Sequence, residues 1–413
     1  MKKIIQIYTD SFKGLSRESW MLAIVMLLNR AGSMVLPFLS VYMTDHLRFS
    51  YEDAGFVLSF FGIGSVLGSW LGGKLTDKFG EFHIQAISLF ASIPMFLLLP
   101  HFTTVSGLAT IMLVHSTICE LFRPANSVAV SKYAKKEDIT RSFSLNRMAV
   151  NLGFSIGPAL GGVLSAISYD FLFYTNALAA GVAGVVYLLF FNKRHQQFKT
   201  DKLTQNTPTK LIKTSESPYR NIPFLKFCLL SLVFSICFFQ LLNTLPQFYK
   251  MEVKLSQENI GYLLGWSGLI VVLLEMLVIN IAERRFTIKT SMLIGTIICG
   301  ISYGMIGVNY HLGMLFVSIS LLSLGEILVL PYMSTITAMA ASKDRQGEYM
   351  GMNGMAVAIS FIISPILGTK IATIYGFSTL WIGTAMIMVL VAIGFYFNIK
   401  KLQLNNKTMS THH

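Results

Sequence analysis

The sequence predicts an all-α integral membrane protein in which twelve transmembrane helices form two pseudo-symmetric six-helix halves. Three observations lead to this fold class: an apolar composition, a series of long apolar windows, and an internal repeat. Only 13% of the 413 residues are charged and the mean hydropathy is +0.60, whereas soluble proteins are typically about 25% charged. Such a chain has too little polar surface to coat a soluble globule, so lipid is its expected solvent.

A helix needs about 20 apolar residues to cross the hydrocarbon core of a bilayer, and windows of this length recur along the chain. The predicted spans are 19–43, 53–75, 83–100, 105–131, 140–166, 170–191, 223–249, 258–282, 289–308, 312–340, 347–374 and 377–399. The polar segment between the sixth and seventh spans holds two prolines and seven Lys/Arg. We therefore predict an N-terminal half at 1–191, a cytoplasmic linker at 192–222, a C-terminal half at 223–400 and a cytoplasmic tail at 401–413.

Basic residues divide unequally between the two ends of these spans. Loops and termini on one side hold 25 Lys/Arg and those on the other side hold 3, which is the positive-inside asymmetry. Both termini are therefore expected in the cytoplasm, and the net charge of +13 is expected to face lipid head groups rather than nucleic acid. Residues 1–20 lack the apolar core and cleavage site of a signal peptide. The first span is thus expected to be an uncleaved helix in a plasma membrane, the bacterial inner membrane.

An internal repeat appears when the sequence is shifted by 207 residues, which lays 123–161 over 330–368 without a gap. Among the identical pairs are Pro124/Pro331, Ser127/Ser334, Lys136/Lys343, Asn146/Asn353, Met148/Met355, Phe154/Phe361, Ile156/Ile363, Pro158/Pro365 and Gly161/Gly368. Spans 4 and 5 thus recur as spans 10 and 11. The two halves are therefore predicted to be parallel repeats related by an axis along the membrane normal.

Twelve spans in two parallel repeats joined by a cytoplasmic linker resemble the major facilitator superfamily, and the resemblance covers nearly the whole chain. The loop after span 2, GGKLTDKFGEF, is similar to the family motif G-x-L-x-D-[RK]-x-G-[RK]. Its matching residues are Gly73, Leu75, Asp77, Lys78 and Gly80, and it departs at Glu81, where the family has a base. A weak echo of the motif, Glu283–Arg284, lies at the corresponding place in the second half.

The resemblance implies a gate at this loop. Asp77 is expected to lie against the cytoplasmic N-terminus of span 11, near Gly347, because a carboxylate is favoured at the positive end of a helix dipole. Formation and release of that contact would close and open the cytoplasmic side.

The stretch Asn151–Gly162, NLGFSIGPALGG, places glycine and proline inside an apolar window, although both disfavour helix interiors. Gly153, Gly157, Pro158, Gly161 and Gly162 match G-x-x-x-G-P-x-x-G-G, a signature similar to span 5 of the antiporter branch of the superfamily. Glycines four residues apart line one helix face and allow a second helix to approach closely. We interpret the stretch as a packing seam, and the resemblance implies in addition a kinked hinge that seals the pathway.

Charged side chains inside the spans are candidates for function, because each costs about 2.5 kcal/mol or more at the bilayer centre. The predicted intramembrane charges are Arg30, Glu120, Arg123, Arg147, Glu275 and Glu326. Spans 3, 6, 9 and 12 carry none in their interiors. The resemblance implies that these four spans face lipid and that the others line a central cavity.

Glu326, Glu120 and Glu275 are the predicted proton-coupling acids. Glu120 and Arg123 are three residues apart and can pair on one helix face, whereas Glu326 and Glu275 have no basic residue within four positions. Burial disfavours an ionised carboxylate, so Glu326 above all is expected to take up and release a proton. The alternative is that these charges form structural ion pairs that hold helices together without titrating.

Candidate substrate-binding residues are the polar and aromatic positions of the cavity-side spans: Arg30, Asn29, Arg123, Asn146, Arg147, Phe234, Phe238, Gln240, Trp266, Tyr332 and Asn353. Arg30, halfway through span 1, is the first candidate for binding a substrate carboxylate or for gating a buried acid. The aromatic side chains suit an amphiphilic substrate. Packing or lipid contact is the alternative for these aromatic residues, and hydrogen bonding between helices is the alternative for Asn146 and Asn353.

These features predict a monomeric, proton-coupled antiporter that exports small amphiphilic compounds, drug-like molecules or short peptides, by alternating access. One alternative is a proton-coupled importer, since GEILVLP of span 10, Arg123–Pro124 and Asn29–Arg30 resemble parts of the oligopeptide symporters. A second alternative is a non-transporting membrane sensor on the same scaffold. The sequence has no phosphate-binding glycine loop, nucleophile–base pair or metal-ligand spacing. We therefore expect no enzymatic activity, metal or cofactor, and a proton gradient as the driving force.

Overall fold

A computed structural model describes residues 2–32, 35–204 and 216–410 of the chain. Within these residues every regular element is a helix, and 11 helical segments are long and apolar enough to cross a membrane. The all-α membrane fold is thereby confirmed. Predicted span 19–43 is not among the 11, because it is divided into short helices. These are α2 (Arg17–Ala31), α3 (Val35–Val41) and a π-helical turn at Tyr42–His46; residues 33–34 lie outside the described part.

The remaining helices of the first half are α1 (Lys2–Phe12), α4 (Tyr51–Phe79), α5 (Glu81–Leu98), α6 (Val105–Glu120), α7 (Phe122–Tyr133), α8 (Ile139–Ile167) and α9 (Tyr169–Thr204), with 3-10 turns at Leu99–His101 and Lys136–Asp138. The second half contains α10 (Ile222–Phe238), α11 (Gln240–Met251), α12 (Gln257–Arg285), α13 (Ile288–Val308), α14 (Leu312–Ile327), α15 (Leu330–Ala340), α16 (Gln346–Tyr375) and α17 (Phe377–Ser410).

Two helices continue past the predicted ends of their spans. Helix α9 runs to Thr204 and α17 to Ser410, whereas the apolar windows end at 191 and 399. The polar segments that follow these windows therefore begin as helix, because polar residues form helix readily once the preceding turns are in place. Residues 205–215 of the predicted linker and 411–413 of the predicted tail lie outside the described residues.

Side-chain caps set where many of the helices begin. The side chains of Ser16, Ser50, Thr104, Asn221 and Ser256 each accept a hydrogen bond from the backbone N–H three residues later. A cap of this kind satisfies one of the four N–H groups that have no partner within the helix.

Proline interrupts spans 4 and 10 at equivalent places of the repeat. Helix α6 ends at Glu120 and α14 ends at Ile327, and each is followed within four residues by a proline, Pro124 or Pro331. Because proline has no N–H, the carbonyl four residues before it loses its helical partner. Both breaks therefore fall directly beside an intramembrane acid, Glu120 in the first half and Glu326 in the second.

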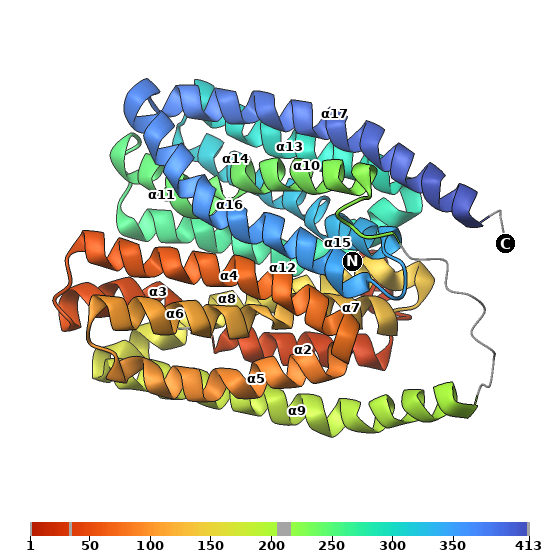
Figure 1. Cartoon of the computed structure of the whole chain (residues 1–413). Helices are drawn as coiled ribbons and strands as arrows, with labels where there is room; N and C mark the ends of the chain where they lie inside the picture. The colour runs from red at the N-terminus through yellow and green to blue at the C-terminus, as the bar shows by residue number, and fades with distance from the viewer. Residues whose placement is uncertain (1, 33–34, 205–215, 411–413) are drawn as a thin grey trace.

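The two halves lie side by side with their long helices roughly parallel (Figure 1). We call the end of the bundle where α9 ends and α10 begins the linker end. Helices α9 and α17 lie on opposite outer edges of the bundle (Figure 1), and they pack mainly on α5 and α13 of their own halves. The charge-free spans 3, 6, 9 and 12 are therefore grouped away from the contact between the halves, where α4 packs on α16 and α8 packs on α12.

The halves are packed together at the linker end. A Cβ added at Gly73 of α4 would lie 2.5 Å from the carbonyl oxygen of Gly347 in α16, so the two backbones touch. At the opposite end, a Cβ added at Gly55, Gly261 or Gly265 would meet no atom within 4 Å. The structure is therefore a state in which the seam between the halves is closed at the linker end.

We expect the linker end to face the cytoplasm, because the basic residues gather there. In a background with the four cysteines replaced by serine, an impermeant maleimide added to intact cells should label Gln257→Cys at the start of α12. It should label Glu216→Cys, an exposed residue at the linker end, only after the cells are permeabilised. Labelling of Glu216→Cys in intact cells would reverse the orientation.

Candidate functional site

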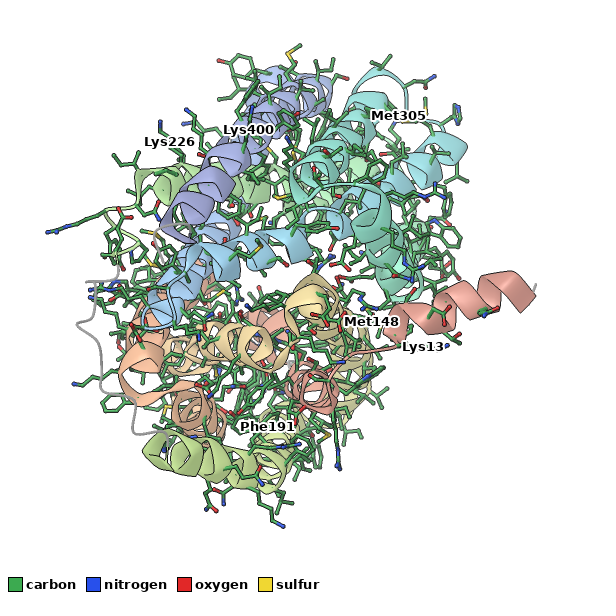
Figure 2. The ribbon with its side chains drawn as sticks, turned by 90° about the vertical axis from the view of Figure 1, so that its right-hand side faces the viewer. Lys13, Met148, Phe191, Lys226, Met305 and Lys400 are labelled. Carbon is green, nitrogen blue, oxygen red and sulfur yellow. The ribbon has the colours of Figure 1, made fainter. Side chains whose placement is uncertain are left out.

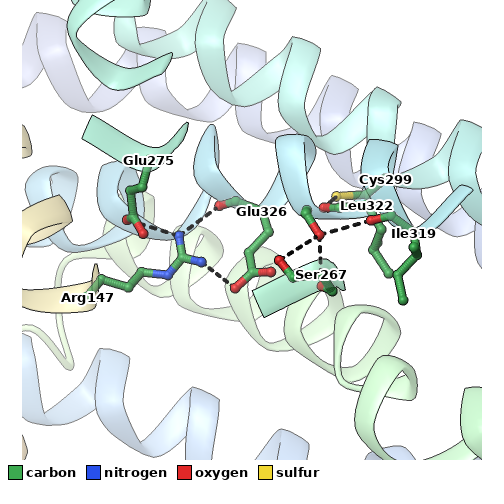
Figure 3. A network of polar contacts seen from close by, with 8 residues as sticks. Arg147, Ser267, Glu275, Cys299, Ile319, Leu322 and Glu326 are labelled. Carbon is green, nitrogen blue, oxygen red and sulfur yellow. Dashed lines mark hydrogen bonds and ion pairs between the residues drawn. The ribbon is translucent and has the colours of Figure 1, made fainter. Parts of the chain in front are cut away.

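One arginine of the first half binds two acids of the second half inside the bundle (Figure 3). Arg147 projects from α8; its Nη1 lies 3.3 Å from Oε1 of Glu275 in α12, and its Nη2 pairs with the carboxylate of Glu326 in α14. Glu275 is fully buried, with 0% of its surface exposed, and Glu326 is nearly so. We call these three side chains the Arg147 bridge.

The broken helix at Glu326 adds a further contact to the bridge. Arg147 Nη1 also donates a hydrogen bond of 3.3 Å to the backbone carbonyl of Glu326. This carbonyl is accessible because α14 ends at Ile327, so its backbone partner is the N–H of Val329 in a tight turn rather than that of residue 330. The break thus lets the guanidinium bind both the side chain and the backbone of one residue.

Glu326 and Glu275 have no basic residue within four positions of the chain, yet both have a basic partner in space. A count along the sequence covers only neighbours on the same helix, whereas Arg147 reaches Glu326 from 179 residues away in the chain. The acid singled out as the least paired is therefore paired across the two halves.

A pair of hydroxyl groups joins the two acid-bearing helices, α12 and α14, one to two helical turns away from Glu275 and Glu326. Ser267 of α12 and Ser323 of α14 share a hydrogen bond of 2.8 Å between their Oγ atoms, and Ser323 Oγ also donates to the carbonyl of Ile319 (Figure 3). On α13, Cys299 Sγ donates to the carbonyl of Leu322 at 3.8 Å. Both helices are thus held in register beside the bridge.

Glu120 and Arg123 form the ion pair that their spacing predicts. Arg123 Nε lies 3.0 Å from Glu120 Oε2, with Glu120 buried and Arg123 partly exposed. Because Glu120 is the last residue of α6 and Arg123 lies in the first turn of α7, the pair spans the helix break in span 4.

Arg30 lies within the first half rather than at the bridge. Its guanidinium sits 5.7 Å from the ring centroid of Phe154, and its Nε has no hydrogen-bond partner among the described residues. Together with Asn29, Ser88, Ser92, Phe96, Cys119, Asn176 and Ala180, Arg30 lines a cavity of about 50 Å³ between α2, α5, α6 and α9. A polar cavity of this size holds a few water molecules.

The predicted asparagines lie at two different kinds of place. Asn146 Oδ1 accepts a hydrogen bond of 3.2 Å from Asn126 Nδ2, which joins α7 and α8 within one half. Asn353 is buried in α16, and its Oδ1 has no hydrogen-bond partner in the described part of the chain. The geometry thus favours the helix-joining interpretation for Asn146 and leaves Asn353 with a free acceptor.

Most of the predicted substrate-binding residues of the second half are packing residues in this structure. Phe234, Phe238 and Tyr332 are buried in the core of the C-terminal half, and the two phenylalanine rings stack 5.9 Å apart. Gln240 is also buried, and its Nε2 donates to the carbonyl of Ser364. Their aromatic rings and amide group pack on or hydrogen-bond to neighbouring helices. In this structure these four residues therefore do not line the open cavity that was expected. Trp266 is 42% exposed and its Nε1 donates to Ser320 Oγ.

The predicted contact of Asp77 with span 11 is confirmed. Asp77 Oδ1 accepts a hydrogen bond of 2.6 Å from the N–H of Gly347, and Oδ2 accepts one of 2.7 Å from the N–H of Glu348. The carboxylate of one half thus caps the first turn of α16 in the other half. A negative charge at a helix N-terminus is stabilising.

The other residues of the loop motif make contacts of their own outside the cap. Gly80 has φ +86, a left-handed conformation that suits glycine, and it joins α4 to α5. Lys78 lies outside the cap, with its Nζ 5.1 Å from the ring of Phe79. Glu81 pairs with Lys132 of α7 at 2.5 Å. An acid at this position therefore serves a contact within the first half.

The glycine face of span 5 packs on span 1. A Cβ added at Gly153 would lie 2.6 Å from Cβ of Arg30 and 2.9 Å from the backbone nitrogen of Ala31, which confirms a close approach of α8 to α2. Gly157 and Gly161 are buried on the same helix, and Pro158 lies inside α8, which continues as one helix to Ile167. Gly162 differs, because its added Cβ would meet only the ring of Phe38 at 3.7 Å.

Further contacts between the halves were not predicted. Arg141 at the start of α8 lies 3.7 Å from Glu283 of α12, and Thr335 of α15 donates to Thr140 Oγ1 at 3.2 Å. Glu283 corresponds to Asp77 in the second half, so the weak second copy of the motif could have predicted that Glu283 contacts the other half. No sequence pattern predicts the contact between Thr335 and Thr140, because single hydroxyl residues are frequent in apolar helices.

A family model of the Major Facilitator Superfamily matches residues 21–288 and 252–411. This chain belongs to that superfamily. The uncharacterized MFS-type transporter YqjV of Bacillus subtilis (strain 168) is 24% identical over 373 residues and covers 88% of both chains. Multidrug resistance protein MdtH of Blochmanniella pennsylvanica (strain BPEN) is 23% identical and covers 79% of this chain and 78% of its own.

Tetracycline resistance protein, class H, of Pasteurella multocida is 23% identical, covering 84% of this chain and 87% of its own. The crystal structure of the human organic anion transporter MFSD10 (TETRAN) superposes with a TM-score of 0.73 at 14% identity, over 92% of this chain and 99% of that one, which shows the shared fold. The protein is thus a multi-pass membrane transporter of the Major Facilitator Superfamily and not an enzyme.

The tight contact of Gly153 predicts that alanine at position 153 lowers the stability of the protein more than alanine at position 162 does. Gly153→Ala should lower the stability of the detergent-purified transporter by about 1–3 kcal/mol, because its Cβ overlaps the backbone of α2. Gly162→Ala adds the same methyl group where there is room, and it should melt like the wild type. Equal melting temperatures for the two variants would contradict the close packing of α8 on α2.

The Asp77 cap predicts that its loss opens the linker end. Asp77→Ala removes two charge-assisted hydrogen bonds to α16, a loss of about 1–2 kcal/mol for a helix cap, which shifts the closed–open equilibrium about 5–30-fold. The measurement is the maleimide labelling rate of Thr335→Cys, a buried residue at the seam between the halves. Glu52→Ala, an exposed acid at the other end of α4, is the control and should leave the rate unchanged. An unchanged rate in Asp77→Ala would remove the gate interpretation.

Proposed function

We propose that this transporter is a proton-coupled antiporter of the bacterial inner membrane that exports small amphiphilic compounds, with both termini in the cytoplasm. The observation that carries the proposal is the Arg147 bridge, in which one base of the first half meets two acids of the second half. Relatives named for multidrug and tetracycline resistance support export of drug-like compounds. The proton gradient supplies the driving force, and no cofactor takes part.

The charges of the bridge suit the uptake of one proton. With both acids ionised, the bridge carries one positive and two negative charges, so one negative charge is left over. A single proton held by the pair of acids makes the bridge neutral, and an uncompensated charge inside a protein is costly. Because both acids contact the same guanidinium, the proton belongs to the pair rather than to one residue.

The place of the bridge links this proton to alternating access. The bridge joins the halves in the state closed at the linker end, and two ionised acids attract Arg147 across the seam more strongly than one does. A proton that arrives from the opposite, open side weakens the attraction to Arg147 and makes opening at the linker end easier. Substrate that binds from the cytoplasm drives the reverse step. Proton and substrate thus favour opposite states, which is the condition for antiport.

We expect loss of pH-driven transport when either acid is fixed in its neutral form. Glu326→Gln and Glu275→Gln should each exchange substrate across the liposome membrane but lose the accumulation that a pH gradient drives. In the wild type this accumulation can reach about tenfold for each pH unit and each coupled proton. Lys370→Gln changes an exposed charge near the end of α16, away from the bridge, and should accumulate substrate like the wild type.

The assay uses dyes, tetracyclines and short peptides with each orientation of the gradient, so it also separates export from import. Full accumulation by both glutamine variants would show that the bridge is structural. Accumulation in the same direction as the proton movement would favour the importer alternative.

A further inference from the structure

The N-terminal helix α1 has two distinct faces. At about 3.6 residues per turn, its apolar and polar residues fall on opposite arcs. The apolar arc contains Ile4, Ile5, Ile7, Tyr8 and Phe12, and the polar arc contains Lys2, Lys3, Gln6, Thr9 and Asp10. A short helix with an apolar face and lysines on the polar face is typical of helices that lie in a membrane interface.

The position of α1 matches this pattern. Viewed along the bundle from the linker end, the transmembrane helices are seen end-on, whereas α1, beside the label of Lys13, extends sideways beyond the outline of the bundle (Figure 2). It therefore lies across the direction of the spans, at the level where the chain enters α2. Tyr8 packs edge-on against Phe12 at 5.4 Å, and Phe12 stacks on Trp20 at 5.8 Å. Trp and Tyr side chains are enriched at membrane interfaces.

The inner end of α1 is held by both halves of the transporter. Ser11 is 0% exposed; its Oγ accepts a hydrogen bond of 3.0 Å from Asn280 Nδ2 of α12. Arg141 Nη1 of α8 donates to the carbonyls of Ser11 and Lys13, at 3.5 and 3.1 Å. The same Arg141 pairs with Glu283 across the seam. A force on α1 therefore acts directly on the closed linker end.

We propose that α1 is an in-plane anchor that binds the anionic head-group surface of the leaflet at the linker end, and that this lipid contact stabilises the closed linker end through Ser11. The occupant of the apolar face is lipid, because the helix projects sideways beyond the bundle directly before the chain enters the first membrane-spanning segment. The charge fits as well, since Lys2, Lys3, Lys13 and Arg17 cluster on this segment and basic residues at a membrane surface attract anionic lipid. The proposal holds whatever the coupling ion is.

The lipid contact is tested with full-length protein, its four cysteines replaced by serine, in vesicles of phosphatidylcholine alone or mixed with phosphatidylglycerol. A polarity-sensitive fluorophore on Tyr8→Cys should shift to the blue when phosphatidylglycerol is present. Lys2→Gln/Lys3→Gln should reduce this shift, whereas Lys400→Gln/Lys401→Gln, two lysines of α17 near the other end of the chain, should retain it. A fluorophore that stays in water in both kinds of vesicle, or a shift that all variants share, would overturn the anchor.

The effect on the gate is tested with the labelling rate of Thr335→Cys in the same vesicles. Phosphatidylglycerol should slow the labelling several-fold in the parent, and Lys2→Gln/Lys3→Gln should remove this difference. Asn280→Ala breaks the contact to Ser11 but leaves the surface of α1 intact, so it should keep the fluorophore shift and lose the lipid effect on labelling. An equal lipid effect in the parent and in Asn280→Ala would overturn the transmission through Ser11.

Discussion

The contact of one guanidinium with two acids and one carbonyl across the two halves is the interaction on which the closed state depends. A buried arginine requires acceptors for its five donors, and the first half alone does not supply them at Arg147. The second half supplies Oε atoms of Glu275 and Glu326 and the backbone oxygen of Glu326, which also accepts from the N–H of Val329 at the end of α14. Separation of the halves at this level leaves these charges without partners unless water or protons replace them.

The two pseudo-symmetric seams between the halves, α8 with α12 and α4 with α16, carry different residues at equivalent positions. Under the shift of 207 residues, Arg147 corresponds to Gly354 and Gly68 corresponds to Glu275. At the seam of α8 and α12 the longer side chains form the bridge. On α4 and α16 both positions are glycine, and both lie close to the Glu120–Arg123 pair: an added Cβ at Gly68 would lie 2.8 Å from Cβ of Glu120 and one at Gly354 would lie 3.9 Å from Cδ of Arg123. The repeat thus preserves the backbone while only one seam carries the paired acids.

At the linker end, the two repeats make equivalent contacts. Asp77 ends α4 against the first turn of α16, and its echo Glu283 lies near the end of α12 against Arg141 in the first turn of α8. In both cases an acid of one half binds the start of the fifth span of the other half. Helix α1 contacts Arg141 and Asn280 beside the second of these contacts, so the start of the chain and the closed seam meet at the linker end.

The sequence by itself determined the long spans other than 19–43, the two halves, the Glu120–Arg123 pair and, through its resemblance to a family motif, the cap by Asp77. The spans, the pair and the cap depend on hydropathy, on helical spacing and on a motif, which are patterns within one segment of the chain, and the two halves follow from a repeat that can be read by shifting the sequence 207 residues. Only the tertiary structure decided the partner of Glu326, because Arg147 is 179 residues away and no local pattern specifies which helices of the two halves face each other. It also decided that Phe234, Phe238 and Tyr332 pack in a core, since an apolar helix carries similar residues on every face and its buried side follows from its neighbours.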